Sequence, residues 1–354
     1  MLSELDVTNF TAFERATFKF SPGLNVIVGA NGSGKSHILK LAYSVAKTSF
    51  NQKDPHRQSK AVWQKAIADD LMKIFRPENL GRLARRQQVA TNTKVSVKFE
   101  KLRDANFLFS FSTKSSTDVK VENEIPTKFA PATPIFIPTK ELLSLFPGLR
   151  ALYNSRELSI DETYPDLCER LEHPLLRGPR LEKIKNIVEP LEEMAGGEVK
   201  NEHGKFYMYQ TEGGRLEIDL VAEGLRKLAT LAFLLKNGSL TDTTALFWDE
   251  PESNLNPLLI KKLARMLMLL SAKKFQIIIA THSLFLLKEL HILSKEAEAN
   301  KVRYFGLSAS QNSATIVSCV DDLETLPDIA SLDAELEQTD RFSDALNKED
   351  ADDN

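Results

Sequence analysis

The eight residues from Gly29 to Ser36, GANGSGKS, constrain the fold more than any other stretch of this chain. They follow an apolar run, LNVIVG, and precede a helix expected from about Lys35. In a loop of the form GxxxxGK[ST], backbone N–H groups converge on nucleotide phosphates, the lysine reaches the β- and γ-phosphates, and the serine hydroxyl binds magnesium. Glycines leave room for the tight backbone path, and the helix N-terminus adds partial positive charge. The sequence therefore predicts a nucleotide site in an α/β fold, with a glycine-rich turn that holds no ligand as the alternative. The residues predicted to hold the nucleotide are Gly29, Ala30, Asn31, Gly32, Ser33, Gly34, Lys35, Ser36 and His37.

Two acids, Asp249 and Glu250, end a second apolar run, TALFW. Buried carboxylates cost several kcal/mol unless a charge pairs with them. Magnesium supplies that charge: Asp249 and Ser36 are the predicted metal ligands. Glu250 is predicted to lie beside the γ-phosphate as the base that polarises the attacking water. An acidic loop flanking a strand is the alternative.

A third apolar run, Phe275 to Ala280, ends in Thr281-His282-Ser283. Ligands of open α/β sheets bind at the carboxyl ends of the parallel strands. We therefore expect His282 on the same sheet edge as Asp249 and Gly29, in contact with the γ-phosphate. A structural histidine at a strand end is the alternative.

The phosphate loop, LFWDEPESNLNP and IIIATHS together resemble the ATP-binding-cassette (ABC) ATPase heads of the RecF, SMC and OLD-type group. The stretches FIPTKELLSLFPGL, ELSIDETYPDLC and LVAEGLRKLATL resemble the small stand-alone AAA-type ATP-binding proteins of bacteria. The resemblance covers about residues 1–318. It implies an α/β P-loop NTPase of ABC-ATPase-head type, with a mixed central sheet, an antiparallel β subdomain and a helical lobe.

The same resemblance implies ATP and Mg²⁺ as cofactors and a homodimer whose heads close face to face. Each nucleotide is then trapped between the phosphate loop of one head and the signature helix of the other. By position, Glu250 would be the base and His282 the γ-phosphate sensor. The stretch Glu252–Pro257, which contains Ser253, Asn254 and Asn256, would be the D-loop that crosses the interface.

The signature helix departs from the family's LSGGQ pattern, because Val221-Ala222-Glu223-Gly224-Leu225 stands in its place. Ala222 removes one hydroxyl contact, and Glu223 brings a negative charge that Arg226 or Lys227 is expected to neutralise. Gly224 and the helix N-terminus are expected still to meet the partner's phosphate. The alternative is an ordinary amphipathic helix ending at Gly238.

The glutamine of a Q-loop is also missing after the predicted strand Thr133 to Glu141. Glu141 is the candidate to replace it, either at the metal water or as a gate for the helical lobe. Alternatively, Lys140 and Glu141 simply begin a helix.

The predicted domains are an ATPase head over residues 1–320 and an acidic tail over 321–354. The head contains a basic helical insertion at about 50–92 and a helical lobe at about 140–198, followed by a hairpin with turns at Asn201–Gly204 and Gly213–Gly214. The cations singled out in the insertion are Lys73, Arg76, Arg82, Arg85 and Arg86. DNA or RNA contact through residues 73–103 is one interpretation, and a solvated or protein-binding surface is the other.

The net charge of -3 conceals an asymmetry, because residues 321–354 carry -11 and residues 1–320 carry +8. The tail, ending in NKEDADDN, is expected to be disordered in part, and it serves as a solubilising segment or as a mask for a basic surface. Cys168 and Cys319 indicate neither a disulfide framework nor a zinc site. No signal peptide or membrane span is recognisable, so a cytoplasmic protein is expected.

Two functions from different classes fit these features. The first is an ATP-hydrolysing switch, dimeric or of higher order, that signals to a separate nuclease or toxin, in phage defence or DNA repair by the family resemblance. The second is a nucleotide-gated scaffold with vestigial hydrolysis. A small-molecule P-loop kinase fits less well, because it needs neither a D-loop nor the His282 switch. The chain shows no acidic cluster of a nuclease after His282, and Asp321 and Asp322 have no recognisable strand context.

Overall fold

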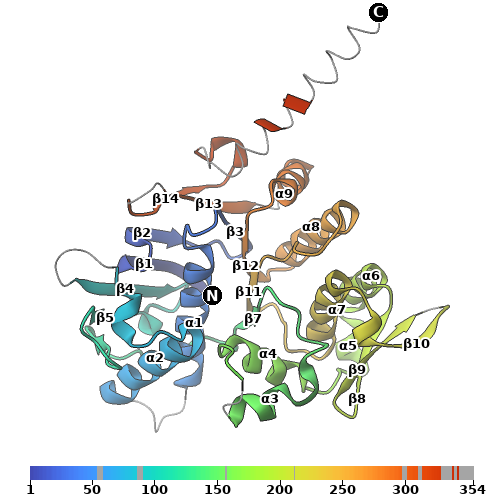
Figure 1. The fold of residues 1–354 in the computed structure, drawn as a ribbon, viewed down its shortest axis with the longest axis horizontal. Helices are drawn as coiled ribbons and strands as arrows, with labels where there is room; N and C mark the ends of the chain where they lie inside the picture. The colour runs from blue at the N-terminus through green and yellow to red at the C-terminus, as the bar shows by residue number, and fades with distance from the viewer. Residues whose placement is uncertain are drawn as a thin grey trace, which may run out of the picture.

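A computed structural model describes residues 1–53, 59–85, 91–155, 158–210, 212–296, 301–309, 313–327, 337–338 and 341–342. Within these ranges the chain forms two large β-sheets, a smaller third sheet and the helices that cover them (Figure 1). None of the helices found there is long and apolar enough to cross a membrane. Cys168 is buried, Cys319 is exposed, and both are free thiols.

The six-stranded sheet contains the strands that lead to the phosphate loop, to the paired acids and to His282. Its order is β14-β13-β3-β12-β11-β7, and every neighbouring pair is parallel except β13 with β14. Because β3, β12 and β11 are adjacent and parallel, their carboxyl ends lie on one edge, as the sequence predicted. The strands are β3 (Leu24–Gly29), β7 (Ile135–Ile137), β11 (Ala245–Asp249), β12 (Gln276–Thr281), β13 (Val302–Ser308) and β14 (Ile316–Val320).

A five-stranded antiparallel sheet, in the order β2-β1-β4-β5-β6, forms a second layer. Helix α1 (Lys35–Asn51) packs against β1, β3, β11 and β12 and thus lies between the two sheets, and α2 (Lys60–Phe75) packs on α1. The insertion expected at about 50–92 is therefore helical in its described part and belongs to this layer. The strands are β1 (Leu2–Phe10), β2 (Phe13–Lys19), β4 (Asn92–Phe99), β5 (Phe107–Ser112) and β6 (Lys120–Val121), with the single turns η2 (Leu80–Leu83) and η3 (Arg103–Ala105).

Alternate residues of the central strands face two different hydrophobic cores. In β12, Ile277 faces the core that the C-terminal helices cover, whereas its neighbour Ile278 faces the core around α1. A strand buried on both faces needs apolar residues throughout, which explains the continuous run IIIA. The helices over the first core are α7 (Glu223–Lys236), α8 (Pro257–Ala272) and α9 (Leu284–Glu296).

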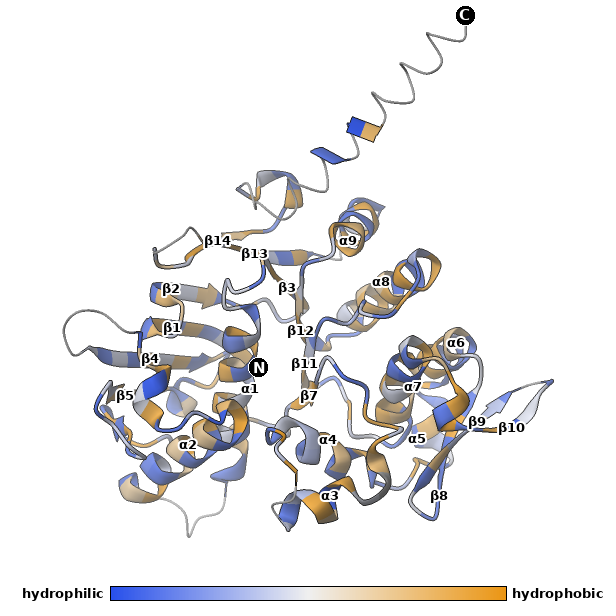
Figure 2. Ribbon diagram, viewed as in Figure 1, coloured by the Kyte–Doolittle hydropathy of each residue, from blue (hydrophilic) through white to orange (hydrophobic). Residues whose placement is uncertain are grey.

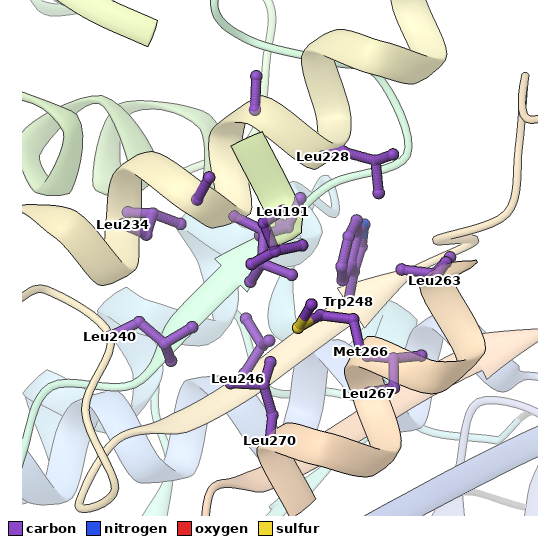
Figure 3. Close-up of a cluster of buried hydrophobic side chains, with 14 of the residues drawn as sticks. Leu191, Leu228, Leu234, Leu240, Leu246, Trp248, Leu263, Met266, Leu267 and Leu270 are labelled. Carbon is purple, nitrogen blue, oxygen red and sulfur yellow. The ribbon is translucent and has the colours of Figure 1, made fainter. Parts of the chain in front are cut away.

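Trp248 of β11 lies at the centre of that first core, between Leu228 of α7 and Leu263 of α8 (Figure 3). Helices α8 and α9 carry both hydrophobic and hydrophilic residues along their length, as expected for helices with one face on a sheet and one in water (Figure 2). The core therefore fixes α7 and α8 relative to the strand that ends in Asp249.

The segment between β7 and α7 is mostly helical at first and then forms the third sheet, β10-β9-β8. The turns predicted at Asn201–Gly204 and Gly213–Gly214 are present, since β8 pairs with β9 and β9 with β10. The elements are α3 (Phe146–Asn154), α4 (Thr163–Leu171), α5 (Pro179–Glu182), α6 (Lys185–Ala195), β8 (Glu198–Glu202), β9 (Lys205–Gln210), β10 (Gly214–Glu217) and the turn η4 (Ile218–Leu220).

The structure contradicts two of the alternatives that the sequence left open. Lys140 and Glu141 do not begin a helix, because α3 starts only at Phe146. The helix after Ala222 is not an ordinary amphipathic one, because every residue from 227 to 236 is buried. Helix α7 packs against α4, α6 and β8, so neighbours surround it on several sides.

The expectation that Asp321 and Asp322 lack a strand context was also wrong, because both directly follow β14. Asp321 pairs with Arg303 at 2.8 Å and Asp322 with Lys295 at 2.8 Å, and the turn η5 (Leu323–Thr325) comes next. The stretch NKEDADDN, for which disorder was expected, lies outside the described residues.

Candidate nucleotide site

The phosphate loop connects β3 to α1, as its motif predicted. Gly34 has a φ of +99°, and a Cβ at this position would lie 2.8 Å from the Phe13 ring, so only glycine fits. The Nζ atom of Lys35 donates to the carbonyl oxygens of Gly29 at 2.7 Å and Ala30 at 3.2 Å. Burial lowers the pKa of Lys35, and the nearby charge of Glu250 opposes this shift. The lysine thus lies over the loop whose N–H groups are predicted to hold phosphate.

The two predicted magnesium ligands lie together. Ser36 Oγ donates a hydrogen bond to Asp249 Oδ1 at 3.2 Å, although the two residues are 213 positions apart in the chain. Burial raises the pKa of Asp249, and the Ser36 hydroxyl opposes this shift. A hydroxyl and a carboxylate oxygen are the donors that Mg²⁺ prefers, so these residues fit the ion.

Glu250 and His282 also lie together, at the ends of neighbouring strands. His282 Nδ1 is 2.6 Å from Glu250 Oε2, with the histidine side chain 53% and the glutamate side chain 16% exposed. Glu250 has a φ of +50°, a left-handed conformation that is rare for a residue with a side chain. Its N–H donates to the Ala280 carbonyl at 2.9 Å, which ties this backbone to β12.

A cavity of about 630 Å³ adjoins the phosphate loop. One wall is the turn of Thr11 and Ala12 between β1 and β2, and the other is the end of the insertion, with Pro77, Arg82 and Leu83. Thr11 N–H donates to the Leu83 carbonyl at 2.9 Å, which joins the two walls. Neither wall was predicted from the sequence, because no motif links it to the loop from Ala30 to His37.

The loop between β11 and α8 is connected to the signature helix by Lys227. The ammonium donates to the Glu250 and Ser253 carbonyls at 3.4 and 3.3 Å and to Ser253 Oγ, and the residue is 1% exposed. Lys227 was expected to neutralise Glu223 near a partner's phosphate. Among the described residues the two side chains form no ion pair, but the charge of Glu223 is the largest influence opposing the lowering of the Lys227 pKa by burial. The long side chain runs inward instead, because the loop offers it oxygen acceptors.

Arg226 is likewise engaged within the chain. Its Nη1 donates to the Val221 carbonyl at 2.6 Å, and its Nε lies 2.9 Å from Glu141 Oε1. Glu141 also accepts hydrogen bonds from the Ser144 N–H and hydroxyl. The carboxylate therefore joins the segment after β7 to the signature helix rather than standing free for a metal water, and Arg226 is not free to neutralise Glu223.

Gly224 has a local structural reason to be glycine. A Cβ there would lie 2.3 Å from the Asn254 carbonyl oxygen, so α7 and the D-loop meet at backbone distance. Asn254 has a φ of +65°, and Asn256 caps α8 by accepting from the Leu259 N–H at 2.9 Å. Ala222 and Glu223 begin α7. The signature and D-loop residues of one chain thus form a single packed unit.

Glu252, two residues after Glu250, was expected only as the first residue of the D-loop, with no task of its own. It is 6% exposed, and its Oε1 accepts a hydrogen bond from Thr281 Oγ1 on β12. Burial raises the pKa of Glu252 to about 7, and the Thr281 hydroxyl opposes this shift. Its position in DEPE, directly after the paired acids, is the only sequence signal that points to it.

The basic region expected to contact nucleic acid is partly neutralised by acids. Lys73 pairs with Glu162, Arg82 with Glu78, Lys98 with Glu4 and Lys101 with Glu100. Arg85 donates to the Ala12 carbonyl at 2.9 Å, Arg76 is exposed, and Arg86 lies outside the described residues.

Known proteins resemble this chain in sequence and in fold. The family described as "AAA domain, putative AbiEii toxin, Type IV TA system" matches residues 24–288. The DNA replication and repair protein RecF of Limosilactobacillus fermentum is 29% identical over 94 residues, which cover 27% of this chain and 24% of that protein. RecF of Salmonella typhi is 40% identical over 57 residues, or 16% of each chain. The matches thus span a quarter or less of these curated relatives.

Among solved structures, an SMC head bound to the C-winged helix domain of ScpA aligns with a TM-score of 0.56 at 15% identity, over 91% of this chain and 98% of that one. The Smc head of Pyrococcus furiosus, with an extended coiled coil and bound to the C-terminal domain of ScpA, aligns with a TM-score of 0.53 at 12% identity, over 98% and 99%. At these identities the likeness concerns the fold, which is that of a P-loop ATPase head.

Proposed function

Because the chain belongs to the AAA domain family that matches residues 24–288, we propose that it binds ATP and hydrolyses it as a head of the RecF and SMC type. One observation carries the proposal: the Ser36–Asp249 pair and the Glu250–His282 pair lie on the same edge of the sheet, beside the phosphate loop. A metal-binding pair next to a carboxylate–imidazole pair is what hydrolysis of a phosphoanhydride requires.

In this proposal each residue has a separate task. Lys35 and the loop N–H groups hold the β- and γ-phosphates, and Ser36 and Asp249 hold Mg²⁺, which neutralises charge on the phosphate oxygens when bound. Glu250 accepts the proton of the attacking water, and His282 contacts the γ-phosphate. The oxygen of that water bonds to the γ-phosphorus as the bond to the β,γ-bridging oxygen breaks, which gives ADP and inorganic phosphate.

We further propose that two chains close head to head on ATP. Ala222, Glu223 and Gly224 would then meet the partner's nucleotide, and Ser253, Asn254 and Asn256 would line the interface. Assembly beyond a dimer is compatible with this arrangement. The output would pass to a separate effector, a nuclease or toxin, in phage defence or DNA repair, in keeping with the description of the family and the RecF relatives. DNA or RNA contact through residues 73–103 has weaker support, because several of those cations are already paired.

A nucleotide-gated scaffold with little hydrolysis is the second candidate. The observation that favours it is the start of α7, where Ala222 brings no hydroxyl and Glu223 brings a negative charge. Arg226 and Lys227 both donate to groups within the chain, and in its described part neither forms an ion pair with Glu223, although the charge of Glu223 opposes the lowering of the Lys227 pKa by burial. Such a head would still close on ATP but would open slowly.

The experiment that tests the proposal measures phosphate release from ATP with Mg²⁺, with Lys35→Ala as the negative control. The mass of the protein in solution is measured in parallel with and without ATP. Mg²⁺-dependent release that Lys35→Ala abolishes supports the ATPase, and ATP-dependent doubling of mass supports the dimer. Doubling of mass without release supports the scaffold instead.

A further inference from the structure

Glu252 is a buried carboxyl to which the proposed reaction gives no task. It lies in the loop between β11 and α8. Loops run over the protein surface, so an acid in a loop is usually exposed to water. Burying a carboxyl costs free energy unless a specific contact compensates. The contact here is the hydrogen bond from Thr281 Oγ1, and Thr281 is itself fully buried at the end of β12.

This contact joins the two halves of the candidate catalytic pair. Glu250 stands two residues before Glu252, and His282 directly follows Thr281. The Thr281 hydroxyl also accepts from the Ser283 N–H at 3.0 Å, which fixes the chain on the far side of His282. One ligand atom from each of Glu250, Glu252 and His282 lies within 4.8 Å of the others.

The backbone at Glu250 needs such support. A φ of +50° is costly for a residue with a Cβ and persists only where the surroundings hold it. Main-chain bonds supply part of the support, since the Glu250 N–H donates to Ala280 and the Ser253 N–H donates to the Glu250 carbonyl at 3.2 Å. Glu252 supplies the side-chain bond from this loop to Thr281.

We propose that Glu252 is a positioning residue for ATP hydrolysis: by holding the loop to Thr281, it keeps Glu250 and His282 at their mutual distance. It acts through these two residues and does not touch the nucleotide. The inference rests on the proposed function, which supplies the reaction that Glu250 and His282 perform. The required feature is an acceptor of the Thr281 hydrogen bond, not a negative charge.

Two substitutions separate the hydrogen bond from the charge. Glu252→Gln keeps an oxygen acceptor of the same reach, whereas Glu252→Ala removes it. We expect Glu252→Gln to retain kcat within about threefold and Glu252→Ala to lower kcat on the order of 100-fold, the effect of a small misplacement of catalytic groups. KM for ATP should stay unchanged in both, because the phosphate loop is untouched. A loss in Glu252→Gln as large as that in Glu252→Ala would overturn the inference, since charge would then be the required property.

A second measurement keeps this test independent of turnover. The imidazole resonances of His282 are recorded by NMR in the nucleotide-free protein, assigned by their disappearance in His282→Asn. We expect them to shift in Glu252→Ala and to keep their wild-type positions in Glu252→Gln. Unshifted resonances in Glu252→Ala would overturn the positioning role. If wild type hydrolyses no ATP, the proposed function fails, and the NMR result alone decides whether Glu252 positions His282.

If Glu252→Ala does not fold, the same bond is removed from its other end. Thr281→Val deletes the donor, and Thr281→Ser retains it. The inference expects Thr281→Val to lose turnover and shift His282, with Thr281→Ser close to wild type. Equal activity of the two variants would contradict it.

Discussion

The Nδ1 atom of His282 lies 2.6 Å from the Oε2 atom of Glu250, although the residues come from different strands. The parallel pairing of β11 and β12 brings them together, because Asp249 is opposite Ala280 in the register. Glu250 comes one residue after Asp249 and His282 two residues after Ala280, so both side chains lie at the same edge of the sheet and meet there. Because the two side chains are in contact, we expect the effects of substituting them on ATP turnover to be non-additive.

His282→Ala should lower ATP turnover on the order of 10- to 100-fold and leave ATP affinity nearly unchanged, because the phosphate loop is intact. The double variant with Glu250→Gln should be little slower than the slower single variant. Steady-state phosphate release and nucleotide titration check both statements. Additive losses in the double variant would contradict the view that the two side chains act together.

Lys227→Met should destabilise the fold by about 1–3 kcal/mol, because it removes the donor to the Ser253 carbonyl oxygen and to the Ser253 hydroxyl. Methionine keeps most of the volume of the side chain. Urea unfolding measures the loss, and Lys261→Met, at a side chain that is 48% exposed on α8, is the matched control. Full stability with loss of ATP-dependent dimerisation would instead support the nucleotide contact that the sequence suggested.

Gly224→Ala should cost about 1–3 kcal/mol of stability, the usual effect of overpacking. The added Cβ would lie 2.3 Å from the Asn254 carbonyl, and backbone cannot move aside as a side chain does. Thermal unfolding of Gly224→Ala beside Glu223→Ala measures the effect. Equal melting temperatures would show that α7 and the D-loop are not packed as closely as described.

Glu252→Gln should change stability in a pH-dependent way. Burial raises the pKa of Glu252 from 4.5 in the unfolded chain to about 7, so the folded protein binds this proton more tightly than the unfolded chain does. Wild type should therefore lose stability relative to Glu252→Gln as pH rises from about 4.5 to about 7, by at most ~1.4 kcal/mol per pH unit, with no further change above that range.

Urea unfolding at pH 5, 6, 7 and 8 without nucleotide or Mg²⁺ measures this difference. Groups that face Glu252 and titrate or carry charge are Glu250, Asp249, His282, Lys35 and Lys227. Lys261→Met provides the control for pH effects elsewhere. A stability difference that does not vary with pH would mean that Glu252 is ionised throughout.

The strand–loop–helix around Lys35 and the three strand ends were predictable because each is a local pattern. An apolar run followed by glycines, acids or a histidine predicts a buried parallel strand with these residues at its carboxyl end. The intramolecular hydrogen bonds of Lys227 and Arg226 were not predictable from the sequence. A cation near a helix N-terminus is normally expected at the surface, unless its acceptors are known. Those acceptors, such as the Ser253 carbonyl, come from a loop elsewhere in the chain.

The pairs Glu252–Thr281 and Glu141–Arg226 were hidden for the same reason. Each joins residues far apart in the sequence, and a lone glutamate after an acid pair or after a strand has no motif of its own. The contact between Thr11 and Leu83 beside the phosphate loop likewise depends on how the insertion packs against the turn between β1 and β2. Local sequence patterns thus predicted the residues of the nucleotide site, whereas the contacts that hold those residues in place depend on the tertiary structure.

Steady-state ATP turnover of wild type beside Glu250→Gln, with Mg²⁺ and at equal nucleotide occupancy, tests whether the chain is an ATPase in which Glu250 is the base. We expect Mg²⁺-dependent turnover by wild type and a loss of about 100-fold or more in Glu250→Gln, the range for a lost general base. ATP binding should persist in the variant. Equal turnover by the two proteins, or none by wild type that nonetheless binds ATP, would contradict this proposal.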